Sequence, residues 1–148
     1  MGTYIMKVKV LACIAVVVVM LVWHNFSLVR VSGNSMSPTI ENGSVVLVLK
    51  NTKAGRGQIA LVSFGNSLVI KRIIGIPGDV VEYRHGLLFI NGERIRESYA
   101  QGTVTDFSCC LGEDEVFLIG DNRERSTDSR DYGPVLSGKL KGRVLVVG

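Results

Sequence analysis

Histidine is scarce in this chain, which has only two among its 148 residues. His24 lies at the end of an apolar run and His85 lies in a predicted turn, so neither is well placed to act as the general base of a serine triad. A hydroxyl nucleophile in this protein would therefore need a different base. Lysine can fill that role when its amine is neutral and can accept a proton.

Cysteine is scarce as well, and three residues do not make a disulfide framework. Cys13 lies inside the apolar run, where a thiol is a small hydrophobic group. The adjacent Cys109 and Cys110 have neither the spacing nor the histidines of a zinc site, and they are either two free thiols or a strained vicinal disulfide. The sequence therefore predicts no metal ion and no cofactor.

Blocks of like charge are absent, because the 17 Lys and Arg residues and the 13 Asp and Glu residues are spread along the chain. The slight excess of positive charge is compatible with an anionic membrane surface, whereas no motif supports nucleic-acid binding. The length suits one domain once an N-terminal anchor is set aside. We therefore expect a lipid bilayer, and no nucleic acid, among the partners.

The N-terminal region carries a long hydrophobic run, fourteen consecutive apolar residues from Val10 to Trp23. A helix continued to Val29 would have twenty residues and would span roughly 30 Å, about the thickness of a bilayer core. Trp23 and Phe26 lie where an interfacial aromatic belt would fall. A cleaved signal peptide would carry a small-x-small site after the run, and a buried core helix would show an amphipathic period. Neither feature is present, so a transmembrane anchor is the favoured interpretation.

Two lysines set the expected orientation of this anchor. Lys7 and Lys9 precede the apolar run and favour a cytoplasmic N-terminus under the positive-inside rule. The expected organisation is a cytoplasmic segment at 1–9, a transmembrane anchor at 10–29 and an extracytoplasmic domain at 30–148. The protein would then be a single-pass protein of the plasma membrane.

The remainder of the chain has the pattern of short strands. Apolar stretches rich in Val and Ile, separated by Gly, Asn and Asp, occur at 44–50, 58–64, 67–76, 79–95, 115–120 and 143–148. Asn91-Gly92 predicts a type I′ hairpin, and His85-Gly86 is a second, weaker turn signal. No long amphipathic helix follows the anchor. We expect a mainly β fold, an antiparallel β-sheet domain with a small hairpin extension, preceded by one N-terminal transmembrane helix.

The stretch "SLVIKRIIGI" places a lysine among β-branched residues. Strand alternation puts Val69, Lys71 and Ile73 on one face, and Ile70 and Arg72 on the other. A fully buried lysine can have its pKa lowered by roughly 3–5 units. A fall of three units costs about 4 kcal/mol, which the surrounding structure must supply. An edge-strand lysine that reaches solvent is the alternative, and alternation alone favours it.

Three segments together resemble the type I signal peptidases, the bacterial serine peptidases that use a Ser-Lys pair. "SGNSMSPTI" at 32–40 is similar to the serine box of that family, and "KRIIGIPGD" at 71–79 is similar to its lysine box. "GDNRERSTDSRDYGPV" at 120–135 is similar to its C-terminal box. The likeness extends over nearly the whole chain and implies the signal peptidase type of catalytic domain.

The resemblance implies a role for each matched residue. Ser35 would be the nucleophile and Lys71 the general base. Ser126 would hydrogen-bond the lysine amine and orient it, beside a salt bridge between Asp128 and Arg130. The remaining matched positions look structural: Pro38, Gly120, Asp121, Asn122 and Arg123.

Two positions depart from the pattern of some relatives. Some members have a serine two residues before the nucleophile, where its hydroxyl helps to stabilise the oxyanion, and this chain has Gly33 there. Loss of one such donor can cost about 10²–10³ in kcat in a serine protease. Glycine at this position also resembles Gram-positive members, so activity is still expected, with the Ser35 N–H as the main donor. Gln58 replaces a common aspartate, which we interpret as a structural difference.

By resemblance, the substrate is the signal peptide of an exported preprotein, cut after a small-x-small motif such as Ala-x-Ala. The residues near the cut would bind as an added strand. Six apolar residues match the shallow pockets of the family: Val29, Val31, Met36, Ile40, Val69 and Ile70. Val and Ile are also the usual residues of a core, so part of this set is expected there instead. The secretion translocon is a further candidate partner.

Other functions are compatible with parts of the sequence. A signal-peptidase-like assembly factor of surface pili lacks the Ser-Lys pair, so the presence of Ser35 and Lys71 argues against it. A self-cleaving repressor has a DNA-binding helix-turn-helix where this chain has its apolar run. A membrane-tethered β-domain that binds a partner is the least specific alternative, and inertness toward active-site reagents would favour it.

Overall fold

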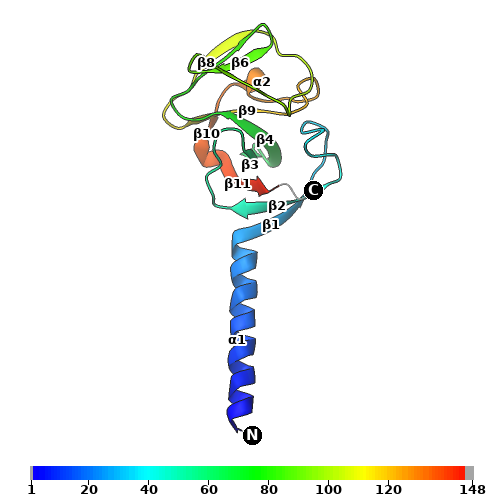
Figure 1. Cartoon of the computed structure of the whole chain (residues 1–148), viewed down its shortest axis with the longest axis vertical. Coiled ribbons are helices and arrows are strands. Elements are labelled where there is room, and N and C mark those ends of the chain that lie inside the picture. The colour runs from blue at the N-terminus through cyan, green and yellow to red at the C-terminus, as the bar shows by residue number, and fades with distance from the viewer. Residues whose placement is uncertain (1, 146–148) are drawn as a thin grey trace.

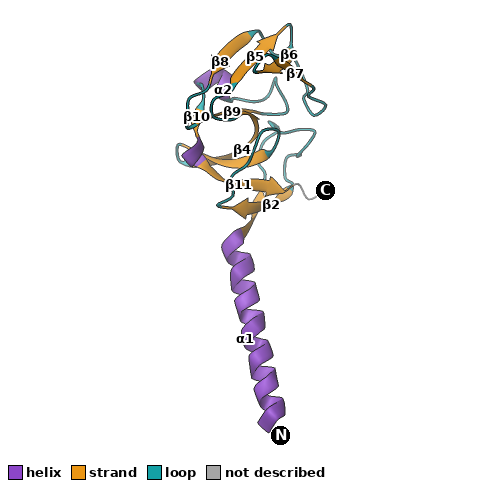
Figure 2. Cartoon of the chain, turned by 60° about the vertical axis from the view of Figure 1, so that its left-hand side comes forward, coloured by secondary structure: helices purple, strands orange, loops and turns teal. Residues whose placement is uncertain are grey.

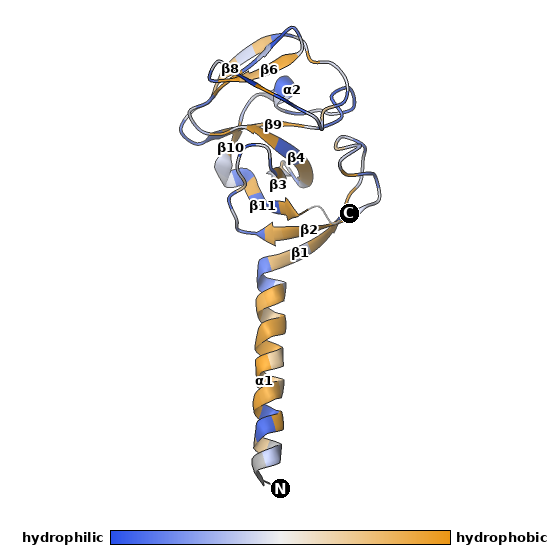
Figure 3. Cartoon of the chain, in the orientation of Figure 1, coloured by the Kyte–Doolittle hydropathy of each residue, from blue (hydrophilic) through white to orange (hydrophobic). Residues whose placement is uncertain are grey.

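A long apolar helix precedes the β-domain in this computed structural model, which describes residues 2–145 (Figure 1). Helix α1 (Gly2–Asn25) contains a 20-residue stretch, Met6–Asn25, that is long and apolar enough to cross a membrane. None of that stretch is buried against the rest of the protein. Figure 3 shows that its surface is mostly hydrophobic, whereas the loops of the domain are largely hydrophilic. An unpacked apolar helix of this length is what a membrane anchor requires.

The helix ends four residues before the expected boundary at Val29. Strand β1 (Phe26–Arg30) follows Asn25 directly and pairs with β2 (Val45–Lys50) in antiparallel register. Hydrophobicity continues through this junction, so it cannot tell the end of a helix from the start of a strand. The end is marked by polar side chains that satisfy free helix carbonyls. Asn25 Nδ2 donates to the Leu21 carbonyl at 2.8 Å, and Lys50 Nζ donates to the Trp23 carbonyl at 2.6 Å.

Seven strands form the larger sheet, in the order β1-β2-β11-β3-β4-β9-β10. Its remaining members are β3 (Ile59–Phe64), β4 (Ser67–Gly75), β9 (Glu115–Ile119), β10 (Val135–Leu136) and β11 (Leu140–Leu145). Every paired strand is antiparallel to its neighbour, as the sequence predicted. The end of the last expected strand, residues 146–148, lies outside the described residues. A four-residue helix α2 (Ser129–Tyr132) and a 3₁₀ turn η1 (Ser137–Lys139) lie near β9 and β11 in the chain (Figure 2).

The extension contains one more strand than the two predicted turns would connect. It is a four-stranded antiparallel sheet, β7 (Glu93–Ile95), β6 (Leu87–Ile90), β5 (Val80–Arg84) and β8 (Phe107–Cys110). Both predicted turns are present: His85 and Gly86 join β5 to β6, and Asn91 and Gly92 join β6 to β7. All four of these residues have positive φ, between 53° and 81°, as type I′ turns require. Strand β8 escaped prediction because "FSCC" has too few apolar residues to show an alternating pattern.

Three apolar clusters form the core. The first packs the segment after Ser35 onto one face of β2, β3, β4 and β11. The second joins the two sheets, because it contains Ile74 of β4 and Phe117 of β9 together with Tyr83 and its neighbours. The third lies on the opposite face of β4 and includes Ile73, with Tyr132 of α2 packed against it. Strand β4, which carries Lys71, contributes one buried residue to each cluster: Ile70 to the first, Ile74 to the second and Ile73 to the third.

Candidate active site

Lys71 lies in the middle of β4, opposite Ala60 of β3, and only 5% of the residue is exposed. Burial disfavours the ammonium form and is the main reason that the pKa of Lys71 lies below its ordinary value of 10.5. The carboxylates of Asp128 and Asp131 oppose this shift, and the Arg130 guanidinium reinforces it. The surroundings therefore favour the neutral amine more than water does.

A hydroxyl and a carboxylate from the segment between β9 and α2 stand behind this lysine. Lys71 Nζ donates to Ser126 Oγ at 2.8 Å, and the Ser126 hydroxyl donates to Asp128 Oδ2 at 2.6 Å. Because the single hydroxyl proton points to the carboxylate, the serine oxygen faces the lysine as an acceptor. One N–H of a neutral Lys71 is thereby used, and its lone pair remains free for another partner.

Asp128 is fully buried and is held from several sides. Arg130 donates Nε to Oδ1 at 2.8 Å and Nη2 to Oδ2 at 2.9 Å, and the Gly120 N–H donates to Oδ2 at 3.0 Å. Asp128 also caps the N-terminus of α2. Burial alone would raise the pKa of this carboxyl, but the hydrogen bonds it accepts outweigh burial and hold its pKa below the ordinary value. The carboxylate is therefore charged and paired near neutral pH.

Ser35 is half-buried at the start of a helical turn in which the Ile40 N–H donates to the Met36 carbonyl at 2.9 Å. The Ser35 carbonyl accepts from the Asn122 N–H at 3.0 Å, which ties the turn to the C-terminal segment. Gly120 explains how close these segments come. A Cβ atom at Gly120 would lie 2.5 Å from the Ser35 carbonyl oxygen and 2.6 Å from the Ser126 Cβ, so only glycine fits.

Asp121 connects the turn after Ser35 to the lysine strand. This fully buried carboxylate accepts two hydrogen bonds from Arg72 and one from the Thr39 hydroxyl. Arg72 neighbours Lys71 on β4, and Thr39 lies four residues after Ser35. One ion pair therefore sets the spacing between the strand that carries the lysine and the turn that carries the serine.

Within residues 2–145, the Ser35 hydroxyl makes no hydrogen bond to the Lys71 amine. Such contacts are often long in the absence of substrate and tighten when it binds. The structure thus brings the serine, lysine and C-terminal segments to one place, with the Ser126 and Asp128 side chains arranged behind the lysine.

Comparison with known proteins identifies the family. A family model described as "Signal peptidase, peptidase S26" matches residues 3–147. The chain belongs to the signal peptidase S26 family.

Individual relatives agree with this assignment. The chain is 31% identical to "Signal peptidase I" of Bacillus caldolyticus, over 91% of this chain and 84% of that protein. It is 35% identical to "Signal peptidase I" of Bacillus amyloliquefaciens, over 68% of this chain and 63% of that protein, so this alignment spans less than two thirds of that relative's length. A crystal structure of a signal peptidase I from Enterococcus faecalis V583 superposes with a TM-score of 0.55 at 32% identity, covering 62% of this chain and 97% of that one.

Gly33, the position where some S26 members have a serine, is exposed and has a φ of 108°. An L side chain there would be strained. Its N–H donates to Asn42 Oδ1 at 2.9 Å, which holds the segment before Ser35. Pro38 is exposed in the turn after the serine. The departure at Gln58 is local as well, because its Oε1 accepts from the Gly55 N–H in the turn before β3.

The six residues matched to the family's pockets do not form one exposed surface. Five belong to the first core cluster, and four of these are at most 8% exposed: Val31, Met36, Ile40 and Ile70 are buried, and Val29 packs against them half-buried. Val69 packs against the third cluster instead. The reason is strand alternation, which turns Val69 and Ile70 to opposite faces of β4. Four of the five therefore belong to the core, and Val29 is half-buried at its edge.

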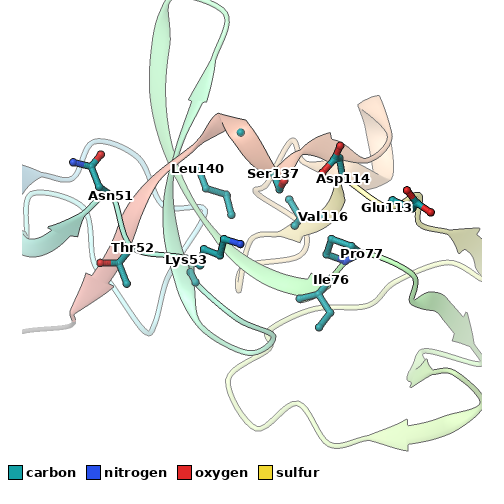
Figure 4. A pocket seen from close by; sticks show the side chains of 12 residues that line it. Asn51, Thr52, Lys53, Ile76, Pro77, Glu113, Asp114, Val116, Ser137 and Leu140 are labelled. Carbon is teal, nitrogen blue, oxygen red and sulfur yellow. The ribbon is translucent and has the colours of Figure 1, made fainter.

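A separate cavity of about 600 Å³ lies beside the far end of β4 (Figure 4). The loop residues Lys53, Pro77 and Glu113 line it together with Ser137 of η1, and Figure 4 shows the Lys53 side chain reaching toward its centre. None of the residues at the Lys71 site lines this cavity. It is therefore distinct from the candidate active site.

A second charged cluster, which the sequence did not predict, lies behind the C-terminal segment. Glu97, which follows β7, accepts from Arg123 Nη2 at 2.6 Å and from the Tyr83 hydroxyl at 2.6 Å. The Tyr99 hydroxyl donates to the same carboxylate at 3.1 Å, and the Arg72 guanidinium lies 3.9 Å from the centre of the Tyr99 ring. No local signal marks Glu97, because Arg123 and Tyr83 are 26 and 14 residues away in sequence. Among the described residues, no group of His, Cys, Asp and Glu has a metal-binding arrangement.

Proposed function

We propose that this chain is a membrane-anchored type I signal peptidase, in which Ser35 attacks the scissile carbonyl and Lys71 is the general base. Signal peptidase I activity follows from the homology, at about 30% identity over most of the chain. The observation that carries the residue roles is the hydrogen-bonded series Lys71–Ser126–Asp128 beside a half-buried serine. This arrangement points the lone pair of a buried amine away from Ser126.

The proposed reaction has two stages. Ser35 Oγ bonds to the scissile carbonyl carbon while its proton passes to Lys71 Nζ. The tetrahedral intermediate then collapses as the C–N bond breaks, and the Lys71 ammonium returns the proton to the leaving amine. In the second stage Lys71 takes a proton from water, the resulting hydroxide attacks the acyl-enzyme, and Ser35 leaves with that proton. The Ser35 N–H is the proposed donor to the oxyanion, because Gly33 has no side chain.

The family implies signal peptides as substrates, and we propose cleavage after a small-x-small motif. We propose that the substrate segment adds as an extended strand beside Val29, over the packed apolar floor of the first core cluster, and that this floor favours small side chains. Each alternate side chain would face this floor. The spacing of the motif matches the period of two of an extended chain.

The anchor supports a position at the membrane surface. A cleft of about 580 Å³ lies where α1 meets the domain, lined by five apolar residues together with Ser27 and Lys50. The exposed Trp23 and Leu28 lie there, as expected for residues at a lipid interface. Lys7 and Lys9 support a cytoplasmic N-terminus with the catalytic domain outside, where preproteins emerge from the translocon. Protease accessibility of the domain in sealed right-side-out vesicles tests this orientation.

Cleavage of a preprotein with an Ala-x-Ala site, in detergent or lipid, tests the function. We expect cutting at that site by the wild type, and none by Ser35→Ala or Lys71→Ala. Equal cutting by all three proteins would assign the activity to another site or to a contaminant. No cutting by the wild type across several substrates and pH values would favour the assembly-factor function.

A further inference from the structure

We propose that Glu97 of the four-stranded sheet is a positioning residue for peptide hydrolysis, acting through Arg123 on the segment that holds Ser126 and Asp128. This inference rests on the proposed function. Glu97 lies outside the three matched sequence boxes, so the extension would also contribute to catalysis.

The first observation is that Glu97 and Arg123 form a buried pair. Their side chains are 10% and 2% exposed, and Arg123 donates both terminal nitrogens to the carboxylate. Tyr83 and Tyr99 donate their hydroxyls to the same carboxylate, at 2.6 and 3.1 Å. The partners of Glu97 are thus one cation and two neutral donors, so its charge is compensated and its position is determined from three sides.

Arg123 carries this position to the catalytic segment. Its Nε donates to the Gly120 carbonyl at 3.1 Å, and its own carbonyl accepts from Arg130 Nη2 at 2.9 Å. Gly120 in turn donates its N–H to Asp128 and leaves no space against the Ser35 carbonyl. A movement of Arg123 would therefore displace Asp128, which accepts the Ser126 hydrogen bond, and the backbone of Ser35.

The backbone beside Glu97 makes a parallel connection. The Gln101 N–H donates to the Asp121 carbonyl at 2.8 Å, and the Gln101 carbonyl accepts from the Arg123 N–H at 2.8 Å. Between these two bonds, the Asn122 N–H donates to the Ser35 carbonyl. The 97–101 segment is therefore bonded through Gln101 to residues 121 and 123, and Ser35 is bonded to residue 122 between them. The extension supports the catalytic segment through its backbone and through one charged side chain.

The charges around Glu97 and Lys71 determine how the pKa of Lys71 should respond to a change at Glu97. Glu97 faces Arg123, Tyr83 and Tyr99, with Arg72 over the Tyr99 ring. Lys71 is influenced by Asp128, Arg130 and Asp131, and burial is the largest cause of its lowered pKa. Loosening the 120–128 segment would admit water to the lysine, weaken the effect of burial and raise its pKa.

Glu97→Gln is the first test, with Glu93→Gln as the matched control. Glu93 is exposed on β7 of the same sheet and lies four residues earlier. For Glu97→Gln we expect kcat to fall about 10²-fold with KM changed less than about threefold, because a displacement near 1 Å at the site costs this much. The acid limb of its pH–kcat profile should move to higher pH. Glu93→Gln should match the wild type in both measurements.

A second variant separates positioning from stability. Replacing both charged partners in Glu97→Gln/Arg123→Met removes the unpaired buried cation, so the thermal midpoint should recover relative to Glu97→Gln alone. This double variant also removes the Arg123 donor to the Gly120 carbonyl, so kcat should stay low. Recovery of kcat together with the thermal midpoint would overturn the proposal.

The two proposals can fail separately. A wild type that does not cut the preprotein, or a Ser35→Ala variant that still does, would refute the proposed function. If the wild type cuts, Ser35→Ala is silent and Glu97→Gln retains wild-type kcat with an unmoved acid limb, only the role of Glu97 is refuted.

Discussion

Gly120→Ala is the substitution that tests the geometry of the site most directly. The backbone at Gly120 does not need glycine for its conformation, because its φ lies outside the positive range. The effect of alanine is therefore steric. Its Cβ would lie 2.5 Å from the Ser35 carbonyl oxygen and 2.6 Å from the Ser126 Cβ, whereas ordinary contact begins at 3.4 Å. One or both neighbours must move by about 1 Å to restore normal contact.

A displacement of that size predicts a specific loss of rate. Moving the nucleophile or the lysine's acceptor by about 1 Å should lower kcat about 10²-fold, equivalent to about 2.7 kcal/mol of transition-state stabilisation. Stability should fall by about 1–3 kcal/mol, as for other overpacked sites. The assay is cleavage of a preprotein under saturating substrate, with kcat expressed per folded molecule and the thermal midpoint measured in parallel.

Two other glycines provide controls for this variant. Gly55→Ala meets open space and should leave both rate and stability unchanged. Gly142→Ala introduces a clash inside the larger sheet, with Val48 Cγ1 at 2.9 Å and the Leu49 carbonyl closer still. It should lower stability without lowering the kcat of the folded fraction. If Gly142→Ala loses as much kcat as Gly120→Ala, or if Gly120→Ala keeps kcat within about threefold of wild type, the steric argument is wrong.

Two further predictions follow from the buried charges. Because Lys71 must be neutral to act as a base, kcat should rise with pH through a pKa below 10.5. Arg130→Met removes a cation that lowers the pKa of the lysine, so this rise in kcat should move to higher pH. A pH–kcat profile unchanged in Arg130→Met would contradict this. Arg72→Met leaves the fully buried Asp121 carboxylate without its cation, and we expect the free energy of unfolding, measured in urea, to fall by about 3–5 kcal/mol. A fall of less than about 1 kcal/mol would show that the Thr39 hydroxyl is enough to stabilise the carboxylate.

Sequence patterns predicted the parts of this fold that depend on local chemistry. The Asn91-Gly92 turn needs two residues with positive φ, and few residue pairs tolerate that conformation. The hairpin could therefore be located from these two residues alone. The alternation in "SLVIKRIIGI" correctly placed Val69 and Ile73 together, in the third core cluster. The same alternation places Val69 and Ile70 on opposite faces of the strand, so they do not share one pocket. Matching residues to family positions alone does not reveal this.

Other features depend on contacts that no local pattern records. The change from helix to strand after Asn25 occurs within continuous apolar sequence, and it is determined by the pairing of β1 with β2 and by the Lys50 side chain. Glu97 follows a short edge strand and resembles any solvated glutamate in sequence. Its importance appears only when the chain brings Tyr83 and Arg123 to it from both sides. Residues of this kind can be found only from the folded structure.

The surroundings of Lys71 would allow a carboxylate to assist the proposed lysine base without protonating it. An isolated Asp128 charge near the amine would stabilise the ammonium and raise the pKa of the lysine. Here Asp128 is bound by Arg130, whose charge has the opposite effect on the lysine, and Ser126 lies between the carboxylate and the amine. The carboxylate can therefore orient the serine hydroxyl while Arg130 opposes part of its electrostatic effect on the lysine, and burial outweighs the remainder to lower the pKa of Lys71. For this reason the site should depend on the Asp128–Arg130 pair more than on either charge alone.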